Sequence, residues 1–311
     1  MGAQFSPASR AEAKLSVLLW GPTESGKTLS ALRLGARLAE REAAFQGRRD
    51  RGRVAVADSE GGRARLHLGS PLLPTGFVFD TLIIEAPHAH AKYVEAARQA
   101  KKDGYDVFIL DTATHAWKAS GGLLEQHHAE MVKLGGMKHN DRAWAKITPL
   151  VNALVHELAH NGMHTIITCR ARWEAKQKFY FVDFRPDTLE YEAAVVFELE
   201  KGSHSALPRK DNTGLFRGND NRVRVKDKIN PVYADMMFDW LHANLPPRPG
   251  DPPNQAWQPT GAQQPGSTPQ PGAPLPLNNN PSQLPVPGPP AISNQPPPTP
   301  PPTGLDLGGL Q

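Results

Sequence analysis

Residues 21–35 read GPTESGKTLSALRLG. They place glycine, proline and hydroxyl residues between an apolar run at 15–20 (LSVLLW) and a segment at 28–44 whose leucines recur at helical spacing. Residues 21–28 match G-x-x-x-x-G-K-[ST], in which glycines let backbone N–H groups converge on a phosphate and the following helix adds its positive N-terminal end. The stretch therefore predicts a strand, a phosphate-binding loop and a helix.

The residue types in this loop predict binding of ATP with Mg²⁺. A lysine at the position of Lys27 reaches the β- and γ-phosphates, and the Thr28 hydroxyl is a magnesium ligand. The alternative is a plain strand–turn–helix corner without a ligand. The residues expected to contact the nucleotide are Gly21, Pro22, Thr23, Glu24, Ser25, Gly26, Lys27 and Thr28.

Short apolar runs alternate with longer amphipathic segments along the chain. Strands are predicted over residues 15–20, 53–58, 79–87, 106–111, 164–169, 191–201 and 221–228. Helices are predicted over residues 28–44, 90–104, 141–162 and 231–245. This alternation predicts an α/β fold with a mostly parallel sheet flanked by helices, in which a ligand lies beyond the carboxyl ends of the strands.

The composition changes near residue 246. Of the 31 prolines, 22 lie from Pro246 onward, in a segment that has only three charged residues. Such a segment cannot bury enough apolar surface to offset chain entropy, so a disordered Pro-rich tail is predicted over residues 246–311 and one domain over residues 1–245. The net charge of +4 permits a nucleic-acid partner, and the single cysteine fits a reducing cytosol. No apolar run of 18 residues exists, so no membrane association is expected.

Other predicted strands end in residues that suit a nucleotide site. The segment YDVFILDTATHAW places Asp111 after four apolar residues, where a carboxylate can hold magnesium through water. The segment RVAVADSEGG places Asp58 and Glu60 near the γ-phosphate, with Glu60 orienting or deprotonating the attacking water. The alternative for these two acids is a cap or a solvated turn. Thr168 ends a fourth strand and is expected to sense the γ-phosphate.

Two basic clusters are candidates for contacts with DNA or with a neighbouring subunit's nucleotide. The first is expected in a loop after Thr168, and the second on one face of a strand, since side chains alternate along a strand. The alternatives are an ordinary solvated loop and a charged edge strand that opposes aggregation. The members are Arg170, Arg172 and Lys176 in the first cluster, and Arg222, Arg224 and Lys226 in the second.

Two other patterns have weaker support. Residues 135–146 are glycine-rich and basic with Trp144 available for stacking, which suits either a mobile DNA-contacting loop or a connector. Residues 156–160, HELAH, match the H-E-x-x-H pattern of zinc proteases. A zinc site also needs a third ligand and an open cleft, and this segment instead lies in a helix between two predicted strands, so packing is the favoured interpretation.

Together, GPTESGKT, DSEGG, FILDTATHAW, TIITCRAR and EYEAAVVFELE resemble the RecA-like, AAA-family P-loop ATPases of phages, a group that includes single-strand annealing proteins of phage recombination. The resemblance runs from about Lys14 to Lys228. It implies a RecA-like core in which Asp111 is the Walker B acid, Glu60 the catalytic glutamate and Thr168 the polar sensor. It also implies an oligomer, a ring or a filament, with ATP at subunit boundaries.

These observations lead to one main hypothesis and two alternatives. The main hypothesis is a DNA-dependent, magnesium-dependent ATPase of phage origin that binds single-stranded DNA and promotes annealing or homologous recombination in the host cytoplasm. The first alternative is a nucleotide-switched assembly or binding protein with negligible turnover, and the second is a P-loop kinase. The Pro-rich tail is expected either to bind a partner, for instance a single-stranded-DNA-binding protein, or to act as a solubilising extension.

Overall fold

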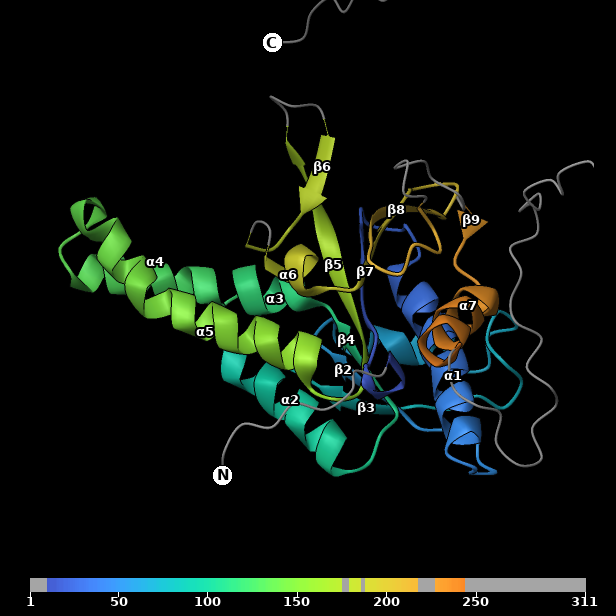
Figure 1. Ribbon diagram of the computed structural model, residues 1–311. Coiled ribbons are helices and arrows are strands. Elements are labelled where there is room, and N and C mark those ends of the chain that lie inside the picture. Colours follow the sequence, from blue (N-terminus) through green and yellow to red (C-terminus); the bar gives the residue numbers. More distant parts are fainter. Residues whose placement is uncertain (1–9, 175–178, 186–187, 218–226, 244–311) are drawn as a thin grey trace, which may run out of the picture. The chain divides into compact units, whose positions relative to one another are not determined.

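The computed structural model describes residues 10–174, 179–185, 188–217 and 227–243 (Figure 1). Within these ranges, nine strands form a sheet in the order β3-β2-β4-β5-β1-β7-β8-β9, and β6 pairs with β5. The strands from β3 to β7 in this order are parallel, whereas β8 and β9 run antiparallel to their neighbours. The mostly parallel, helix-flanked sheet predicted from the sequence is therefore confirmed.

The elements have the following bounds. The strands are β1 (Ser16–Gly21), β2 (Val54–Asp58), β3 (Asp80–Ile83), β4 (Val107–Asp111), β5 (His164–Glu174), β6 (Phe179–Val182), β7 (Val195–Leu199), β8 (Ser205–Asp211) and β9 (Asp227–Lys228). The α-helices are α1 (Lys27–Phe45), α2 (His90–Lys102), α3 (Ala113–Lys118), α4 (Leu123–Lys133), α5 (Asn140–His160), α6 (Thr188–Glu192) and α7 (Pro231–His242). The 3₁₀ helices are η1 (Arg10–Glu12), η2 (Arg63–His67) and η3 (Met137–His139).

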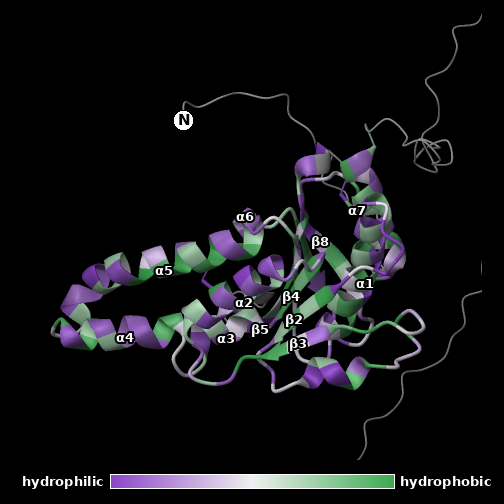
Figure 2. Cartoon of the chain, turned by 90° about the horizontal axis from the view of Figure 1, so that it is seen from below, coloured by the Kyte–Doolittle hydropathy of each residue, from purple (hydrophilic) through white to green (hydrophobic). Residues whose placement is uncertain are grey.

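Helices cover both faces of the sheet, which explains why its central strands are continuous apolar runs. Helices α1 and α7 pack on one face, and α2, α3, α5 and α6 pack on the other (Figure 1). Along β1, Val17 and Leu19 belong to the core beneath α1, whereas Leu18 and Trp20 belong to the opposite core. The strands are accordingly hydrophobic through the centre of the molecule, while the helices carry hydrophilic outer faces (Figure 2).

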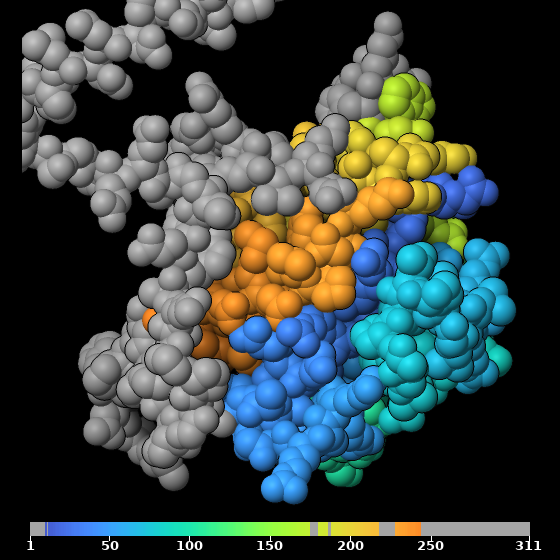
Figure 3. Space-filling view, turned by 90° about the vertical axis from the view of Figure 1, so that its right-hand side faces the viewer, coloured from blue at the N-terminus to red at the C-terminus, as the bar shows by residue number. Residues whose placement is uncertain are grey.

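Helix α7 packs beside α1 on the same face of the sheet. In the space-filling view the orange surface of α7 lies directly against the blue surface of α1 (Figure 3). Phe238 of α7 is buried, and Arg37 of α1 donates to Asp235 of α7 at 2.8 Å. Asp235 also accepts a hydrogen bond from Arg41, so one α7 carboxylate joins two α1 arginines. This packing holds α1 in place, including its first turn, which directly follows the phosphate loop.

The structure corrects three local predictions. The loop expected after Thr168 is wrong, because β5 continues to Glu174 and pairs with β6. The mobile loop considered for residues 135–146 is also wrong, because η3 and the first turns of α5 occupy most of it; residues 135–139 are the connector between α4 and α5, and the helix predicted over residues 141–162 is present. The strand expected over residues 191–201 is shorter, Val195–Leu199, since residues 191 and 192 belong to α6.

Several predictions fall on residues that the structure does not describe. They concern Lys176, the basic residues Arg222, Arg224 and Lys226, and the Pro-rich tail with its boundary at residue 246. Over the described ranges, no helix combines the length and the apolar character that crossing a membrane requires.

Candidate functional site

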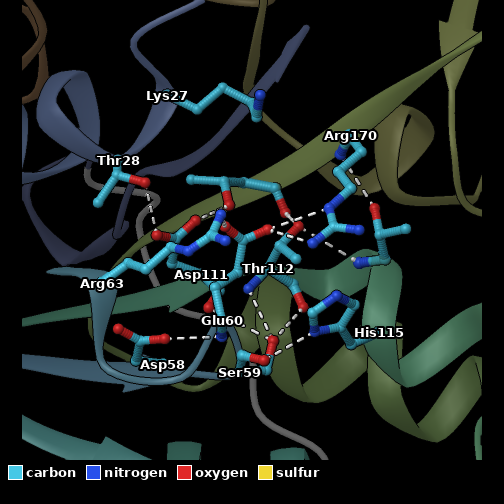
Figure 4. A network of polar contacts seen from close by, with 12 residues as sticks. Lys27, Thr28, Asp58, Ser59, Glu60, Arg63, Asp111, Thr112, His115 and Arg170 are labelled. Atoms are coloured by element: carbon cyan, nitrogen blue, oxygen red, sulfur yellow. Dashed lines mark hydrogen bonds and ion pairs between the residues drawn. The ribbon is translucent and has the colours of Figure 1, made fainter. Parts of the chain in front are cut away.

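Polar side chains gather at one edge of the sheet, where β1, β2 and β4 end, beside the middle of β5 (Figure 4). Strand β5 lies between β1 and β4, and this order brings Lys27 and Thr28, which follow β1, close to Asp111 at the end of β4. Asp58 and Asp111 are register partners on adjacent strands. The chain therefore assembles at this edge four segments that are far apart in the sequence, as a parallel sheet with ligands at its carboxyl edge requires.

The phosphate loop has the backbone geometry that its sequence predicts. Gly26 has φ 84°, in the left-handed region, and α1 begins at the next residue. A side chain on Gly21 would place its Cβ 2.5 Å from the carbonyl oxygen of Leu199, so only glycine fits there. The first N–H groups of α1 have no acceptor within the helix, and they carry the positive end of its dipole. The loop is thus arranged to bind an anion.

Lys27 folds back over this loop. Its Nζ donates to the carbonyl oxygens of Gly21 at 3.0 Å and Pro22 at 2.8 Å. Burial lowers the pKa of Lys27, and the nearby carboxylates of Asp111 and Glu60 partly oppose that shift. The amino group of Lys27 is therefore partly desolvated, and it bonds to neutral carbonyl groups rather than to a carboxylate.

The other loop residues divide into buried and exposed positions. Ser25 is fully buried, and its backbone N–H donates to the carbonyl of Pro22 at 3.3 Å. Thr23 and Glu24 are exposed, and the Glu24 carboxylate pairs with Lys201 at 3.1 Å. The side chain of Glu24 therefore lies on the outer surface of the loop.

Asp111 is buried among hydroxyl groups. The Thr28 Oγ1 donates to Asp111 Oδ2 at 2.7 Å, and the Thr168 Oγ1 donates to Asp111 Oδ1. Only 2% of Asp111 is exposed, and burial raises the pKa of this carboxyl above its usual value although the two hydroxyls act to lower it. No lysine or arginine pairs with Asp111 among the residues that the structure describes. Thr168 is buried and lies within β5 rather than at its end.

This donor set fits a magnesium ion. Mg²⁺ prefers hard oxygen ligands, and it commonly takes one or two protein groups together with phosphate oxygens and water. The Thr28 hydroxyl and the Asp111 carboxylate are such ligands, and they are already within hydrogen-bond distance of each other. A cation there would neutralise a carboxylate that its own chain leaves without a cationic partner.

Glu60 lies in the same cluster and is held by arginines. Arg170 donates to Glu60 Oε1 from Nε at 3.0 Å and from Nη2 at 2.8 Å. Arg63 lies 3.7 Å from the other carboxylate oxygen. Glu60 therefore points into the site, as Figure 4 shows, with one oxygen engaged by a strong charge-assisted contact.

Asp58 does not face the phosphate loop. It is fully buried, its Oδ1 accepts from the backbone N–H of Glu60 at 2.7 Å, and its Oδ2 accepts from that of Ala64 at 3.0 Å. The expectation that Asp58 faces the γ-phosphate is therefore wrong, and the capping alternative describes it. Its role is to shape the turn that presents Glu60.

A second polar layer supports the site, and sequence reasoning missed most of it. The Ser59 hydroxyl bonds with the carbonyl of Thr112 at 3.1 Å and accepts from the N–H of Thr112 at 3.0 Å. The Thr112 hydroxyl donates to the carbonyl of Thr168 at 2.8 Å, and His115 Nδ1 lies 2.8 Å from the carbonyl oxygen of Ser59. These bonds tie the ends of β2, β4 and β5 together. The only sequence signal was their position just after predicted strands.

The β5–β6 hairpin projects beyond the site (Figure 1). Trp173 and Tyr180 are register partners, and their rings make an edge contact with centroids 5.0 Å apart. Both are unusually exposed for aromatic residues, Trp173 at 51% and Tyr180 at 39%. Arg172 is also exposed. The hairpin therefore presents two aromatic rings on one face and, because side chains alternate along a strand, the Arg172 cation on the other face.

The weaker motifs have structural explanations. Trp144 stacks on the His127 ring, with centroids 3.9 Å apart, so the prediction that it is available for stacking on a base is wrong. In the HELAH segment, Glu157 pairs with Arg98 at 2.8 Å and His160 with Glu192 at 2.9 Å. Within the described ranges, no group of three or more His, Cys, Asp or Glu residues is arranged to hold a metal.

Comparison with known proteins agrees with this geometry. A family model described as an AAA domain matches residues 13–179, which is more than half of the chain. The match includes the phosphate loop, Glu60, Asp111 and Thr168. No curated protein matches the chain. The chain belongs to this family, and its fold is that of a P-loop NTPase-type domain.

Proposed function

We propose that this AAA-domain protein is a magnesium-dependent ATPase that binds single-stranded DNA and promotes strand annealing or homologous recombination, in a phage. The observation that carries the ATPase part is the cluster at the carboxyl edge of the sheet. There a desolvated lysine, a hydroxyl–carboxylate pair suited to Mg²⁺ and a glutamate lie around one phosphate-binding loop. This is the combination that phosphoryl transfer to water needs.

Each side chain has a distinct role in this proposal. Lys27 binds the β- and γ-phosphate oxygens, for which it exchanges its present carbonyl partners. Thr28 and Asp111 hold Mg²⁺, which neutralises charge on the phosphates. Glu60 accepts a hydrogen bond from the attacking water and orients it in line with the γ-phosphorus. Thr168 reports the state of the site through its bond to Asp111.

The DNA-binding part is supported by the β5–β6 hairpin. Proteins that bind single strands combine cations that contact the backbone with aromatic rings on which bases stack. Exposed Trp173 and Tyr180 supply two rings on one face of the hairpin, and exposed Arg172 supplies a cation on its other face, next to the ATP site along β5. The backbone contacts proposed for Arg222, Arg224 and Lys226 fall outside the described residues.

The proposed assembly is a homo-oligomer, a ring or filament, in which basic residues of one subunit contact the nucleotide of the next. The tail from residue 246 is proposed to bind a protein partner, for instance a single-stranded-DNA-binding protein. Deleting residues 246–311 should leave ATP binding unchanged and weaken only the partner interaction. Loss of ATP binding in this truncation would place the domain boundary elsewhere.

The first experiment is ATP hydrolysis with and without single-stranded DNA, with Lys27→Ala as the control. We expect DNA to stimulate hydrolysis in the unmodified protein and not in the variant. A second candidate function, a nucleotide-switched assembly protein, is favoured by the ion pair that engages Glu60. Nucleotide binding without DNA-stimulated turnover would support that candidate and contradict the recombination ATPase.

A further inference from the structure

We propose that Arg170 is a positioning residue that exchanges its partner when ATP binds: it holds Glu60 in the arrangement seen here and transfers to the γ-phosphate, which releases Glu60 to the water. This inference rests on the proposed ATPase function and adds a regulatory step within the same chain. It also gives Arg170 a role different from the DNA or trans-subunit contact predicted from the sequence.

The backbone of Arg170 is fixed beside the phosphate loop. Arg170 is the register partner of Gly21, the first residue of that loop. Its N–H donates to the Thr114 hydroxyl at 2.9 Å, and its carbonyl accepts from the N–H of Asp183 at 2.8 Å. Hydrogen bonds of its backbone to α3 and to the residue after β6 therefore anchor Arg170, so that only its side chain is able to change partner.

The side chain has both the freedom and the charge for such an exchange. The side chain of Arg170 is 44% exposed, whereas that of Glu60 is only 16% exposed. Both donors of Arg170 reach a single oxygen, Glu60 Oε1, so the guanidinium does not use the fork geometry that binds both oxygens of a carboxylate. A terminal phosphate offers several anionic oxygens and matches that fork better.

The electrostatic balance of the cluster favours the exchange. Arg170 pairs with Glu60 at the same edge of the sheet as Lys27 (Figure 4). Glu60 compensates these two cations in the present arrangement. A triphosphate brings negative charge to the same place, so it satisfies Arg170 and leaves Glu60 with the weaker contact to Arg63 at 3.7 Å. The carboxylate is then available as an acceptor for water.

Binding of ADP and of a non-hydrolysable ATP analogue tests this exchange without relying on turnover. In Arg170→Ala the affinity for the analogue should fall roughly tenfold to a hundredfold, the effect of one charge-assisted contact, while the ADP affinity changes less than about twofold. Arg98→Ala is the matched control, because Arg98 also pairs with a glutamate at 2.8 Å but lies on α2 away from the site. An equal effect on both nucleotides, or none on either, would overturn the exchange.

A double-mutant cycle separates a switch from a merely structural ion pair. Arg170→Ala, Glu60→Gln and the double variant are compared by thermal unfolding with ADP and with the analogue. We expect the two substitutions to be non-additive with ADP, by a few degrees, and additive with the analogue. Coupling that is the same with both nucleotides would refute the proposal. If the unmodified protein bound neither nucleotide, the proposed ATPase function itself would fail, which is a different result from either of these.

Discussion

A buried carboxylate lies near each end of the central strands, and the two carboxylates have different surroundings. Near the start of β5, Glu42 is 4% exposed and accepts hydrogen bonds from Lys14 at 2.6 Å and from His164 at 3.2 Å. At the end of β4, Asp111 is 2% exposed and, among the described residues, accepts only from the hydroxyls of Thr28 and Thr168. Glu42 thus bonds directly to a lysine, whereas the direct partners of Asp111 are neutral hydroxyl groups.

The pKa values of the two acids shift in opposite directions. Burial by itself raises both pKa values. For Glu42 the hydrogen bonds from His164 and Lys14 outweigh burial and hold the pKa well below its usual range, whereas for Asp111 burial dominates and the pKa rises. Because the chain compensates Glu42 and leaves Asp111 without a cationic partner among the described residues, we infer that the first cluster stabilises the fold and the second binds a cation.

The two lysines provide the test with the largest expected effect. Lys27→Ala should weaken ATP binding and hydrolysis by about 10²–10³-fold, because a desolvated cation beside the phosphate loop is lost. Lys14→Ala, in the other cluster, should lower the unfolding temperature and leave nucleotide affinity unchanged. Nucleotide titration and thermal unfolding of both variants measure this. Similar effects of the two variants on ATP affinity would contradict the division into a stabilising and a binding cluster.

Glu42→Gln tests the stabilising cluster directly. The substitution keeps the size of the side chain but removes the charge that Lys14 and His164 share. We expect a loss of about 2 kcal/mol in the free energy of unfolding, less than for breaking a fully buried pair because the Lys14 side chain is 26% exposed. Denaturant unfolding measures the loss. An unchanged midpoint would show that the pair contributes nothing net to stability.

The features that the sequence predicts well are local. The phosphate loop, its strand and its helix depend on residues 15–44, where turn residues and helical periodicity are contiguous. Strand β8 was missed because Pro208 argues against a strand; the structure pairs it with Phe197 at a register shift, where a missing ladder donor is tolerated. Helix α4 was missed although its buried residues, Leu123, His127 and Met131, are four apart.

The contacts that make up the site are not local, so the sequence predicts only their components. Glu60 and Arg170 are 110 residues apart, and their pairing depends on the order of β2, β4 and β5 in the sheet. The motif predicted an acid and a base near the phosphate but not that they engage each other. Asp58, unlike Glu60, caps a turn and does not face the phosphate loop. This difference also depends on backbone positions that no residue pattern specifies.

The exposed rings of the β5–β6 hairpin lie at the end of the sheet that holds Asp111, not at the end that holds Glu42. Trp173→Ala should weaken single-stranded DNA binding roughly tenfold, since stacking on one base contributes about 1–3 kcal/mol, and Tyr180→Ala should act in the same direction. ATP affinity should not change. Fluorescence anisotropy with labelled DNA measures the effect, and Trp117→Ala is unsuitable as a control because that ring is buried. Exposed Tyr191 on α6 is the better control position.

The smallest expected effect has the opposite sign from that of Glu42→Gln. Asp111→Asn should raise the free energy of unfolding at pH 7 without ligand by about 1 kcal/mol, because a buried charge is removed and an amide can still bond with two hydroxyls. The same variant should lose the dependence of nucleotide binding on Mg²⁺. Unfolding and Mg²⁺ titration with ADP measure the two effects. A destabilised Asp111→Asn protein would contradict the conclusion that Asp111 is uncompensated.

Acidification distinguishes the two carboxylates further. The folded pKa of Asp111 is raised above 3.8, so the cost of its charge is fully present above that raised pKa and declines to zero as the pH falls below 3.8. The folded pKa of Glu42 is lowered, so its contribution is fully present above 4.5 and is lost progressively as the pH falls from 4.5 through the lowered value. At neutral pH the free energy of unfolding should be higher for Asp111→Asn than for the unmodified protein, and lower for Glu42→Gln. Both differences should approach zero as the pH falls, and the difference for Asp111→Asn should do so at the higher pH. Parallel pH profiles for the two variants would show that neighbouring groups, and not these two carboxylates, set the acid sensitivity of the sheet ends.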